Sequence, residues 1–238
     1  MMETDVRRTK DGALVIMHDA TVDRTTDGVG RVAGLTLAQI KRLHLRQNFG
    51  GAMSPMITDQ RVLTLDEMLA AAKGRIMLNL DIKEAIYPEV IAAAVRAGVA
   101  DQVLVKTPVY TLEPPVADQT PYDRVHYMPI IWQTTAVHPI DLGAVAARQS
   151  VAVHRIPAVE MVYLDQAQFE AVRNAAKAAN VRLWANTLTS VGVLSIVTMG
   201  GDVDALRDPT TWGRLIDAGV TVIQTDEPGN LMDFLRKH

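Results

Sequence analysis

The sequence of 238 residues contains no cysteine, which excludes disulfide bonds and metal sites built from thiolates. It has no apolar run approaching the ~18 residues needed to cross a lipid bilayer. Its formal charge of −3 arises from interspersed acidic and basic residues, so it predicts no basic surface for nucleic acid. No signal peptide opens the sequence at Met1, and a cytoplasmic, periplasmic or secreted location stays open.

The sequence does have a regular alternation of strand and helix patterns, which predicts a parallel sheet with crossover helices. A hydrophobic fraction of 48% is sufficient for one large α/β domain over residues 1–238. These features favour a (β/α)8 barrel of the TIM type. We count about seven candidate strands and an extra arm at 14–17, whereas an eight-stranded barrel requires one strand more.

Local patterns also predict where several elements begin and end. Thr36 and Thr64 each precede a Gln or Glu by three residues, which forms a capping box at a helix start. Pro88 and Asp165 mark two further helix starts, and Gly98 marks a helix end. The predicted strands include 76–82, 103–105, 128–132, 151–156, 181–184 and 220–225.

Two segments have the composition of long loops. Residues 44–63 contain Gly50, Gly51 and Pro55, and residues 108–124 contain four prolines. We expect 44–63 to be a loop excursion over the mouth of the barrel, where it could shape a substrate pocket.

The most informative chemistry lies near the N-terminus. Glu3 and Asp5 are two positions apart on a predicted strand, so both side chains face the same way and could share one hard cation. A turn at 11–12 and a second apolar run follow, and this hairpin could carry His18 back towards the cation. Without thiolates or clustered histidines, such a site favours Mg²⁺ or Ca²⁺ over zinc. Metal ligands beside a histidine make a candidate hydrolytic site.

Four linked sequence elements occur here in a fixed order: Glu-x-Asp-Val from Glu3, Thr-Lys-Asp-Gly from Thr9, Val-x-x-His-Asp from Val15, and Asp-Arg-Thr-Thr-x-Gly-x-Gly from Asp23. Together they resemble the signature of the glycerophosphodiester phosphodiesterase family. Further along, Asn-Leu-Asp-Ile-Lys at 79–83 is similar to the family's strand that ends in Glu-x-Lys. The segment 223–228 resembles its closing Thr-Asp-x-Pro strand.

The resemblance implies a metal-dependent phosphodiesterase that converts glycerophosphodiesters, which are deacylated phospholipids, to glycerol phosphate and an alcohol. It implies one divalent cation, Mg²⁺ or Ca²⁺, held by Glu3, Asp5 and Asp81. Asp81 stands where the family has glutamate, and its shorter side chain could alter the affinity for the metal.

The resemblance also assigns roles around the substrate. It makes His18 the general acid and Lys83 a contact to the phosphate. Trp184 could form a wall of the glycerol pocket or could simply pack in the core. The partner is then a small molecule, with neither nucleic acid nor a membrane span involved.

One part of the family pattern has no counterpart. In the family, a strand with His-Arg-Gly and a Pro-Glu-Asn-Thr segment precede the Glu-x-Asp strand, whereas this sequence begins at Met1. We therefore expect a barrel lacking its first strand, either in a piece of a longer protein or in a member that lacks the motif. The resulting open edge beside 3–6 predicts a cover such as a second copy of the chain.

The same gap leaves three functions open. The chain could be a glycerophosphodiesterase of weak activity, because one catalytic histidine and the phosphate-binding arginine are missing. It could be a related enzyme acting on other phospholipid head groups, or a promiscuous phosphoesterase. It could also be a catalytically silent relative that binds metal or phosphate without turnover.

Overall fold

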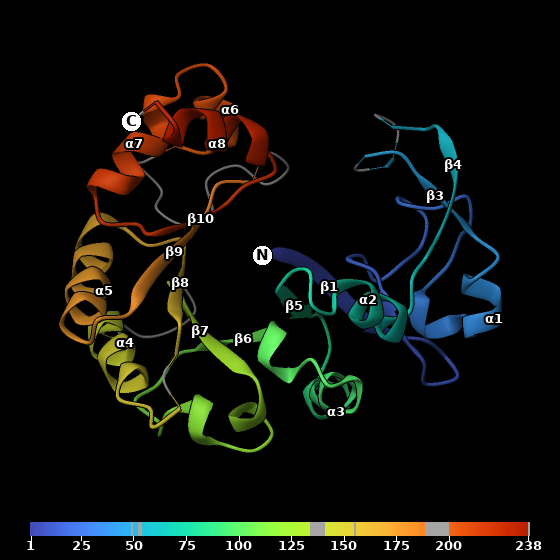
Figure 1. Ribbon diagram of the computed structural model, residues 1–238, viewed down its shortest axis with the longest axis horizontal. Helices are drawn as coiled ribbons and strands as arrows, with labels where there is room; N and C mark the ends of the chain where they lie inside the picture. The colour runs from blue at the N-terminus through green and yellow to red at the C-terminus, as the bar shows by residue number, and fades with distance from the viewer. Residues whose placement is uncertain (49, 52–53, 134–140, 155, 189–199, 238) are drawn as a thin grey trace. The chain divides into compact units, whose positions relative to one another are not determined.

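The computed structural model describes residues 1–48, 50–51, 54–133, 141–154, 156–188 and 200–237. Its contacts divide the chain into two compact units. The first unit comprises residues 1–106 and 120–126, and the second comprises 107–119 and 127–238. Each unit contains successive strands and helices of the α/β pattern expected from the sequence (Figure 1). Within the described ranges, every helix is too short or too polar to cross a lipid bilayer.

The sheet of the first unit is built around β1 (Met2–Arg8). On one side β1 runs parallel to β5 (Leu78–Ile82), and β5 runs parallel to the start of β6 (Val103–Val109). β5 is buried along almost its whole length, although the polar residues Asn79 and Asp81 alternate with its three apolar residues. The β1–β5 register places Glu3 beside Asn79 and Asp5 beside Asp81.

The other side of β1 is covered by the hairpin arm β2 (Leu14–Ile16), which runs antiparallel to it. Gly12 adopts φ = 85° in the connecting turn, a conformation that glycine reaches without the steric cost of a side chain. The backbone nitrogen of Met17 donates a hydrogen bond to the carbonyl oxygen of Asp5. The prediction of an open edge beside 3–6 is therefore partly wrong, because the chain's own arm pairs with β1 from Asp5 onward.

Both predicted capping boxes are present in the first unit. Thr36 caps α1 (Leu37–Ile40), and Thr64 caps α2 (Leu65–Ala72). α3 (Tyr87–Ala97) has Pro88 in its first turn and ends at Gly98, which adopts φ = 65°. Short 3₁₀ turns occur at η1 (Val32–Gly34), η2 (Ala100–Gln102) and η4 (Tyr122–Arg124).

The segment 44–63 differs from the loop expected there. It contains β3 (His44–Arg46) and β4 (Ile57–Arg61), which pair as an antiparallel ribbon. Most side chains of β4 are exposed, so the ribbon lacks the alternation of apolar and polar residues by which a half-buried strand is recognised. Its position over a barrel mouth stays a prediction.

The described part of the second unit contains a run of parallel strands with helices between them (Figure 1). The strands are β7 (His126–Trp132), β8 (Ala158–Val162), β9 (Arg182–Asn186) and β10 (Val222–Gln224). The helices are α4 (Leu142–Ser150), α5 (Gln166–Ala178), α6 (Asp202–Ala205), α7 (Thr210–Asp217) and α8 (Pro228–Leu235), with a 3₁₀ turn η3 (Val116–Asp118). The Asp165 side chain caps α5, as predicted.

The strand predicted at 151–156 is wrong. Residues 151–154 form turns and bends, and the strand lies at β8 instead. Val151 and Val153 suggested a strand, but their side chains are 64% and 87% exposed. The five residues of β8 are all buried, and this burial identifies the true strand.

Candidate functional site

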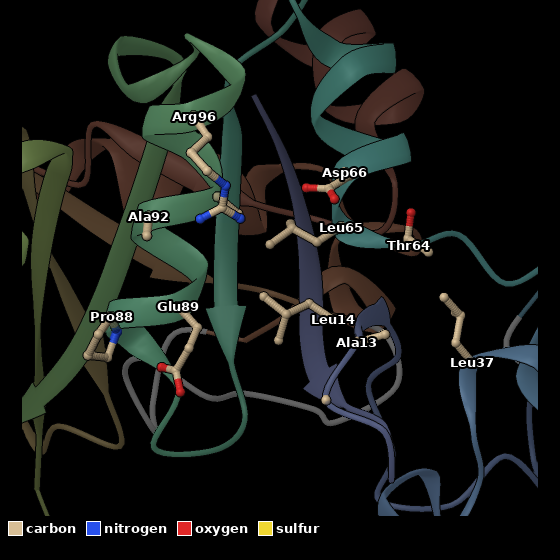
Figure 2. A pocket seen from close by; sticks show the side chains of 12 residues that line it. Ala13, Leu14, Leu37, Thr64, Leu65, Asp66, Pro88, Glu89, Ala92 and Arg96 are labelled. Carbon is tan, nitrogen blue, oxygen red and sulfur yellow. The ribbon is translucent and has the colours of Figure 1, made fainter.

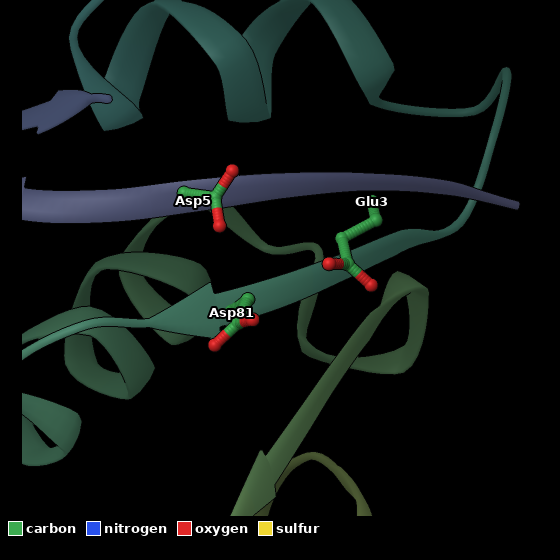
Figure 3. Close-up of side chains that lie close together, drawn as sticks. All are labelled: Glu3, Asp5 and Asp81. Atoms are coloured by element: carbon green, nitrogen blue, oxygen red, sulfur yellow. The ribbon is translucent and has the colours of Figure 1, made fainter. Parts of the chain in front are cut away.

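Three carboxylates meet at two neighbouring strands of the first unit (Figure 3). Glu3 and Asp5 alternate along β1, so they share one face, and the register places Asp81 directly beside Asp5 on that face. Each of the three residues offers one carboxylate oxygen, and these oxygens all lie within 4.8 Å of one another. The convergence predicted from the sequence is confirmed in the structure.

Two lysine ammonium groups lie among the carboxylates. Lys83, just after β5, places Nζ 2.8 Å from Asp81 and 3.0 Å from Asp5. Lys106 on β6 places Nζ 3.1 Å from Glu3 and 3.9 Å from Asp81. The Lys106 side chain is only 3% exposed, so its charge is held in the sheet by these acidic partners.

Neighbouring charges determine the ionisation of this cluster. Burial opposes ionisation of Asp81, but the ammonium groups of Lys106 and Lys83 hold its pKa below the ordinary value. Burial would lower the pKa of Lys83, but the carboxylates of Asp81 and Asp5 raise it. At neutral pH Asp81 is therefore ionised and Lys83 is protonated.

Asn79 supports the cluster from β5. It is fully buried, and its Nδ2 donates a hydrogen bond of 2.7 Å to Oε2 of Glu3, the oxygen that Lys106 also contacts. Two donors from neighbouring strands thus fix the Glu3 carboxylate. Asn79 lies two residues before Asp81, so strand alternation directs both side chains to the same face.

The donor set fits a hard divalent cation. Oxygens that each lie about 2.0–2.6 Å from one ion can be at most about 5 Å apart, a limit that the three carboxylates meet. All three donors are carboxylates, and such ligands suit Mg²⁺ or Ca²⁺.

His18 follows the β2 arm. Val15 and Met17 are buried in a small apolar cluster under the arm, while the side chain of His18 is 61% exposed. Its Nδ1 lies 2.7 Å from Oδ1 of Asp19. When protonated, His18 is close enough to Asp81 for its charge to stabilise that carboxylate.

Trp184 belongs to the second unit, where it lies on β9 and is 6% exposed. Its Nε1 donates hydrogen bonds to Oδ1 of Asn186 (2.8 Å) and Oε1 of Gln224 (3.2 Å). Asn186 in turn donates to Oε1 of Glu160 at 2.7 Å. Trp184 is thus part of a buried polar network, and its role as a wall of a glycerol pocket stays a prediction.

Two contacts of the site region could not be predicted from the sequence. Lys106 follows the apolar run 103–105 and so lies near a predicted strand end, but its contact with Glu3 depends on how β5 and β6 pair. Asp19 and Arg24 form an ion pair across the loop after β2, with 2.7 Å between Arg24 Nε and Asp19 Oδ2. Their spacing in sequence matches no helix or strand period, so only the folded loop reveals the pair.

A separate cavity of about 550 Å³ opens in the first unit (Figure 2). Leu14 of β2, Leu65 of α2 and Ala92 of α3 line it, with Glu89 and Arg96 among its charged groups. None of the three clustered carboxylates lines this cavity, so the cavity is separate from the candidate site.

Comparison with known proteins identifies relatives of this chain. One curated relative, a glycerophosphodiester phosphodiesterase from Caldanaerobacter subterraneus subsp. tengcongensis, is 38% identical over 99 residues, which are 40% of this chain and 39% of the relative. The matched segment thus spans well under half of that relative's length.

Two solved structures share the fold. A glycerophosphoryl diester phosphodiesterase from Parabacteroides distasonis has a TM-score of 0.68 at 23% identity, covering 99% of this chain and 75% of the other. A phosphodiesterase from Oleispira antarctica, solved with the product sn-glycerol-3-phosphate, has a TM-score of 0.63 at 19% identity, covering 98% and 84%. These likenesses establish the barrel fold class that the sequence predicted. The family pattern itself matches residues 1–230, and the chain therefore belongs to the glycerophosphoryl diester phosphodiesterase family.

Proposed function

We propose that the chain forms a divalent-cation-dependent phosphodiesterase site that hydrolyses glycerophosphodiesters to glycerol phosphate and an alcohol. The observation that carries this proposal is the convergence of Glu3, Asp5 and Asp81, flanked by Lys83 and Lys106, in a chain of this family. The relatives' names supply the reaction type, and the cluster supplies charges suited to a phosphate.

The residues of the cluster have complementary tasks. Glu3, Asp5 and Asp81 would hold one cation, Mg²⁺ or Ca²⁺, which when bound neutralises phosphate oxygens. The side chain of Lys83 is 23% exposed, and its ammonium group would contact a phosphate oxygen. Lys106 is nearly fully buried and balances the acids from within the sheet. His18 would donate the proton that the leaving alkoxide requires, the role of a general acid.

The experiment is a glycerol phosphate release assay on glycerophosphocholine with Mg²⁺ or Ca²⁺, repeated after EDTA and after metal is restored. We expect weak release that EDTA abolishes and metal restores. His18→Ala should lower kcat by about 10²–10⁴-fold, the usual contribution of a positioned acid or base. The matched control is His126→Ala, since His126 is exposed and bonds the carbonyl oxygen of Asp101 instead.

Activity that is indifferent to both EDTA and His18→Ala would contradict the site assignment. Metal binding without release of glycerol phosphate would favour the catalytically silent alternative. Release from other phosphodiesters, but not from glycerophosphocholine, would favour a related head-group or promiscuous phosphoesterase.

A further inference from the structure

The carboxylate of Asp19 connects His18 to Arg24. Oδ1 of Asp19 lies 2.7 Å from Nδ1 of His18 and accepts a hydrogen bond of 2.8 Å from Nη2 of Arg24. Oδ2 accepts a second bond from Nε of Arg24 at 2.7 Å. Two parallel bonds from a planar guanidinium fix the plane of a carboxylate as well as its position. The oxygen that meets the His18 ring is therefore held in one orientation.

The backbone on both sides of this contact is also fixed. Nε of Arg7 donates a hydrogen bond of 2.9 Å to the carbonyl oxygen of His18. The carbonyl oxygen of Arg24 accepts a bond of 2.7 Å from the nitrogen of Gly51. A Cβ atom at Gly50 would lie 2.2 Å from that carbonyl, so only glycine allows this approach. His18 and Arg24 are thus anchored independently of their side chains.

This arrangement has a chemical consequence for the imidazole. A neutral histidine carries its proton on one ring nitrogen and has a lone pair on the other. A carboxylate at Nδ1 favours the tautomer with the proton on Nδ1, which leaves Nε2 to exchange a proton with a substrate.

We propose that Asp19, held by Arg24, is a positioning residue that fixes the Nδ1–H tautomer and the ring orientation of His18, so that proton transfer occurs at Nε2. Its part in catalysis rests on the proposed function. The contact itself does not depend on that function, and this allows the two to be tested separately.

The chain offers a matched control in the same unit. His44 Nδ1 lies 2.9 Å from Oδ2 of Asp27, so this pair repeats the histidine–carboxylate contact on β3. Asp27→Ala removes such a carboxylate without touching the His18 contact. An effect on the His18 tautomer or on kcat that Asp19→Ala shows and Asp27→Ala lacks is then due to the contact between Asp19 and His18.

The first measurement is a long-range ¹H–¹⁵N correlation spectrum of the ¹⁵N-histidine-labelled chain at about pH 8, where imidazoles are mainly neutral. His18→Ala identifies the His18 signals. We expect the Nδ1–H tautomer for His18 in the wild type and in Asp27→Ala, and its loss in Asp19→Ala. A wild-type His18 in the Nε2–H tautomer, or one unaffected by Asp19→Ala, would overturn the proposal.

The second measurement is the kinetics of glycerophosphocholine hydrolysis. Asp19→Ala should lower kcat by about 10²-fold with little change in KM, as expected when a catalytic group loses its alignment. Asp19→Asn, which keeps an acceptor oxygen, should recover part of the loss, and Asp27→Ala should leave kcat unchanged. An active wild type whose kcat survives Asp19→Ala would overturn the proposal. The expected tautomers in a chain without hydrolytic activity would support the positioning contact and contradict the proposed function.

Discussion

Charged groups next to the strands are arranged in opposite ways in the two units. In the first unit, three carboxylates and Lys83 are 19–24% exposed and are balanced by long ammonium side chains. In the second unit, Asp202 is completely buried and accepts hydrogen bonds from three side chains and one backbone nitrogen. The partly exposed charges of the first unit can meet a ligand, whereas a buried carboxylate enclosed by hydrogen-bond donors stabilises the fold.

The largest effect should come from breaking the Asp202 network. Its oxygens accept bonds from Thr187 Oγ1 (2.5 Å), Trp212 Nε1 (3.2 Å), Thr225 Oγ1 (2.7 Å) and the Asp226 nitrogen (2.8 Å). Asp202→Ala leaves these donors without their acceptor and should lower the free energy of unfolding by about 3 kcal/mol or more.

Chemical denaturation measures this loss, and Asp204→Ala in the same helix is the control. Asp204 is exposed and accepts one bond from the nitrogen of Gly201, so its loss should cost about 1 kcal/mol. Equal effects of the two substitutions would show that Asp202 has no special structural role.

The next largest effect concerns Trp184. Trp184→Phe keeps most of the buried ring but removes the donor to Asn186 and Gln224. We expect a loss of about 1–2 kcal/mol in the free energy of unfolding, because the acceptor oxygens of Asn186 and Gln224 lose this donor. A raised KM for glycerophosphocholine at unchanged stability would instead identify Trp184 as a wall of the substrate pocket.

Lys83→Met tests the charged cluster of the first unit by its effect on ligand binding. Removing the ammonium group between Asp5 and Asp81 should strengthen binding of a divalent cation by about tenfold, since a competing positive charge is gone. The same change should weaken binding of glycerol phosphate by about tenfold, which corresponds to about 1.4 kcal/mol. Calorimetry with each ligand separates the two effects. Parallel changes in both affinities would contradict the assigned role of Lys83.

The smallest expected change in the free energy of unfolding concerns the Asp19–Arg24 pair. The hydrogen bonds from Arg24 outweigh partial burial and hold the pKa of Asp19 at about 2. A depressed carboxyl pKa stabilises the fold above the unfolded value of about 3.9, and this contribution is lost as the pH falls towards 2.

After allowance for solvent screening of the pair, Asp19→Asn should cost about 1 kcal/mol at neutral pH. Measured unfolding free energies should show this difference shrinking between pH 4 and pH 2. If the wild type and Asp19→Asn differ by the same free energy of unfolding over that pH range, the pH dependence does not arise from ionisation of Asp19.

The sequence predicted the acidic cluster well because strand alternation and one parallel register decide it. Glu3 and Asp5 are two residues apart, and the motif at 79–83 placed Asp81 on the adjoining strand. Helix starts with side-chain caps were equally predictable, as at Thr64 and Asp165. Such features depend on a few neighbouring residues.

Features that depend on distant contacts could not be predicted in this way. Lys106 reaches Glu3 only through the β5–β6 pairing, and Arg24 meets Asp19 through a folded loop. The exposed Val151 and Val153 resembled a strand because hydrophobicity alone does not report burial. Asp202 joins α6 to the ends of two strands, and no local period links these positions.

Glu3, Asp5 and Asp81 should together hold one divalent cation. Isothermal titration of Ca²⁺ and Mg²⁺ into the wild-type chain, Asp81→Asn and Asp59→Asn measures this binding. Asp59 lies exposed on β4 and controls for the loss of one negative charge. We predict one site in the wild type and in Asp59→Asn, and binding at least about tenfold weaker in Asp81→Asn. Equal affinities in all three chains, or no saturable binding in the wild type, would contradict the account.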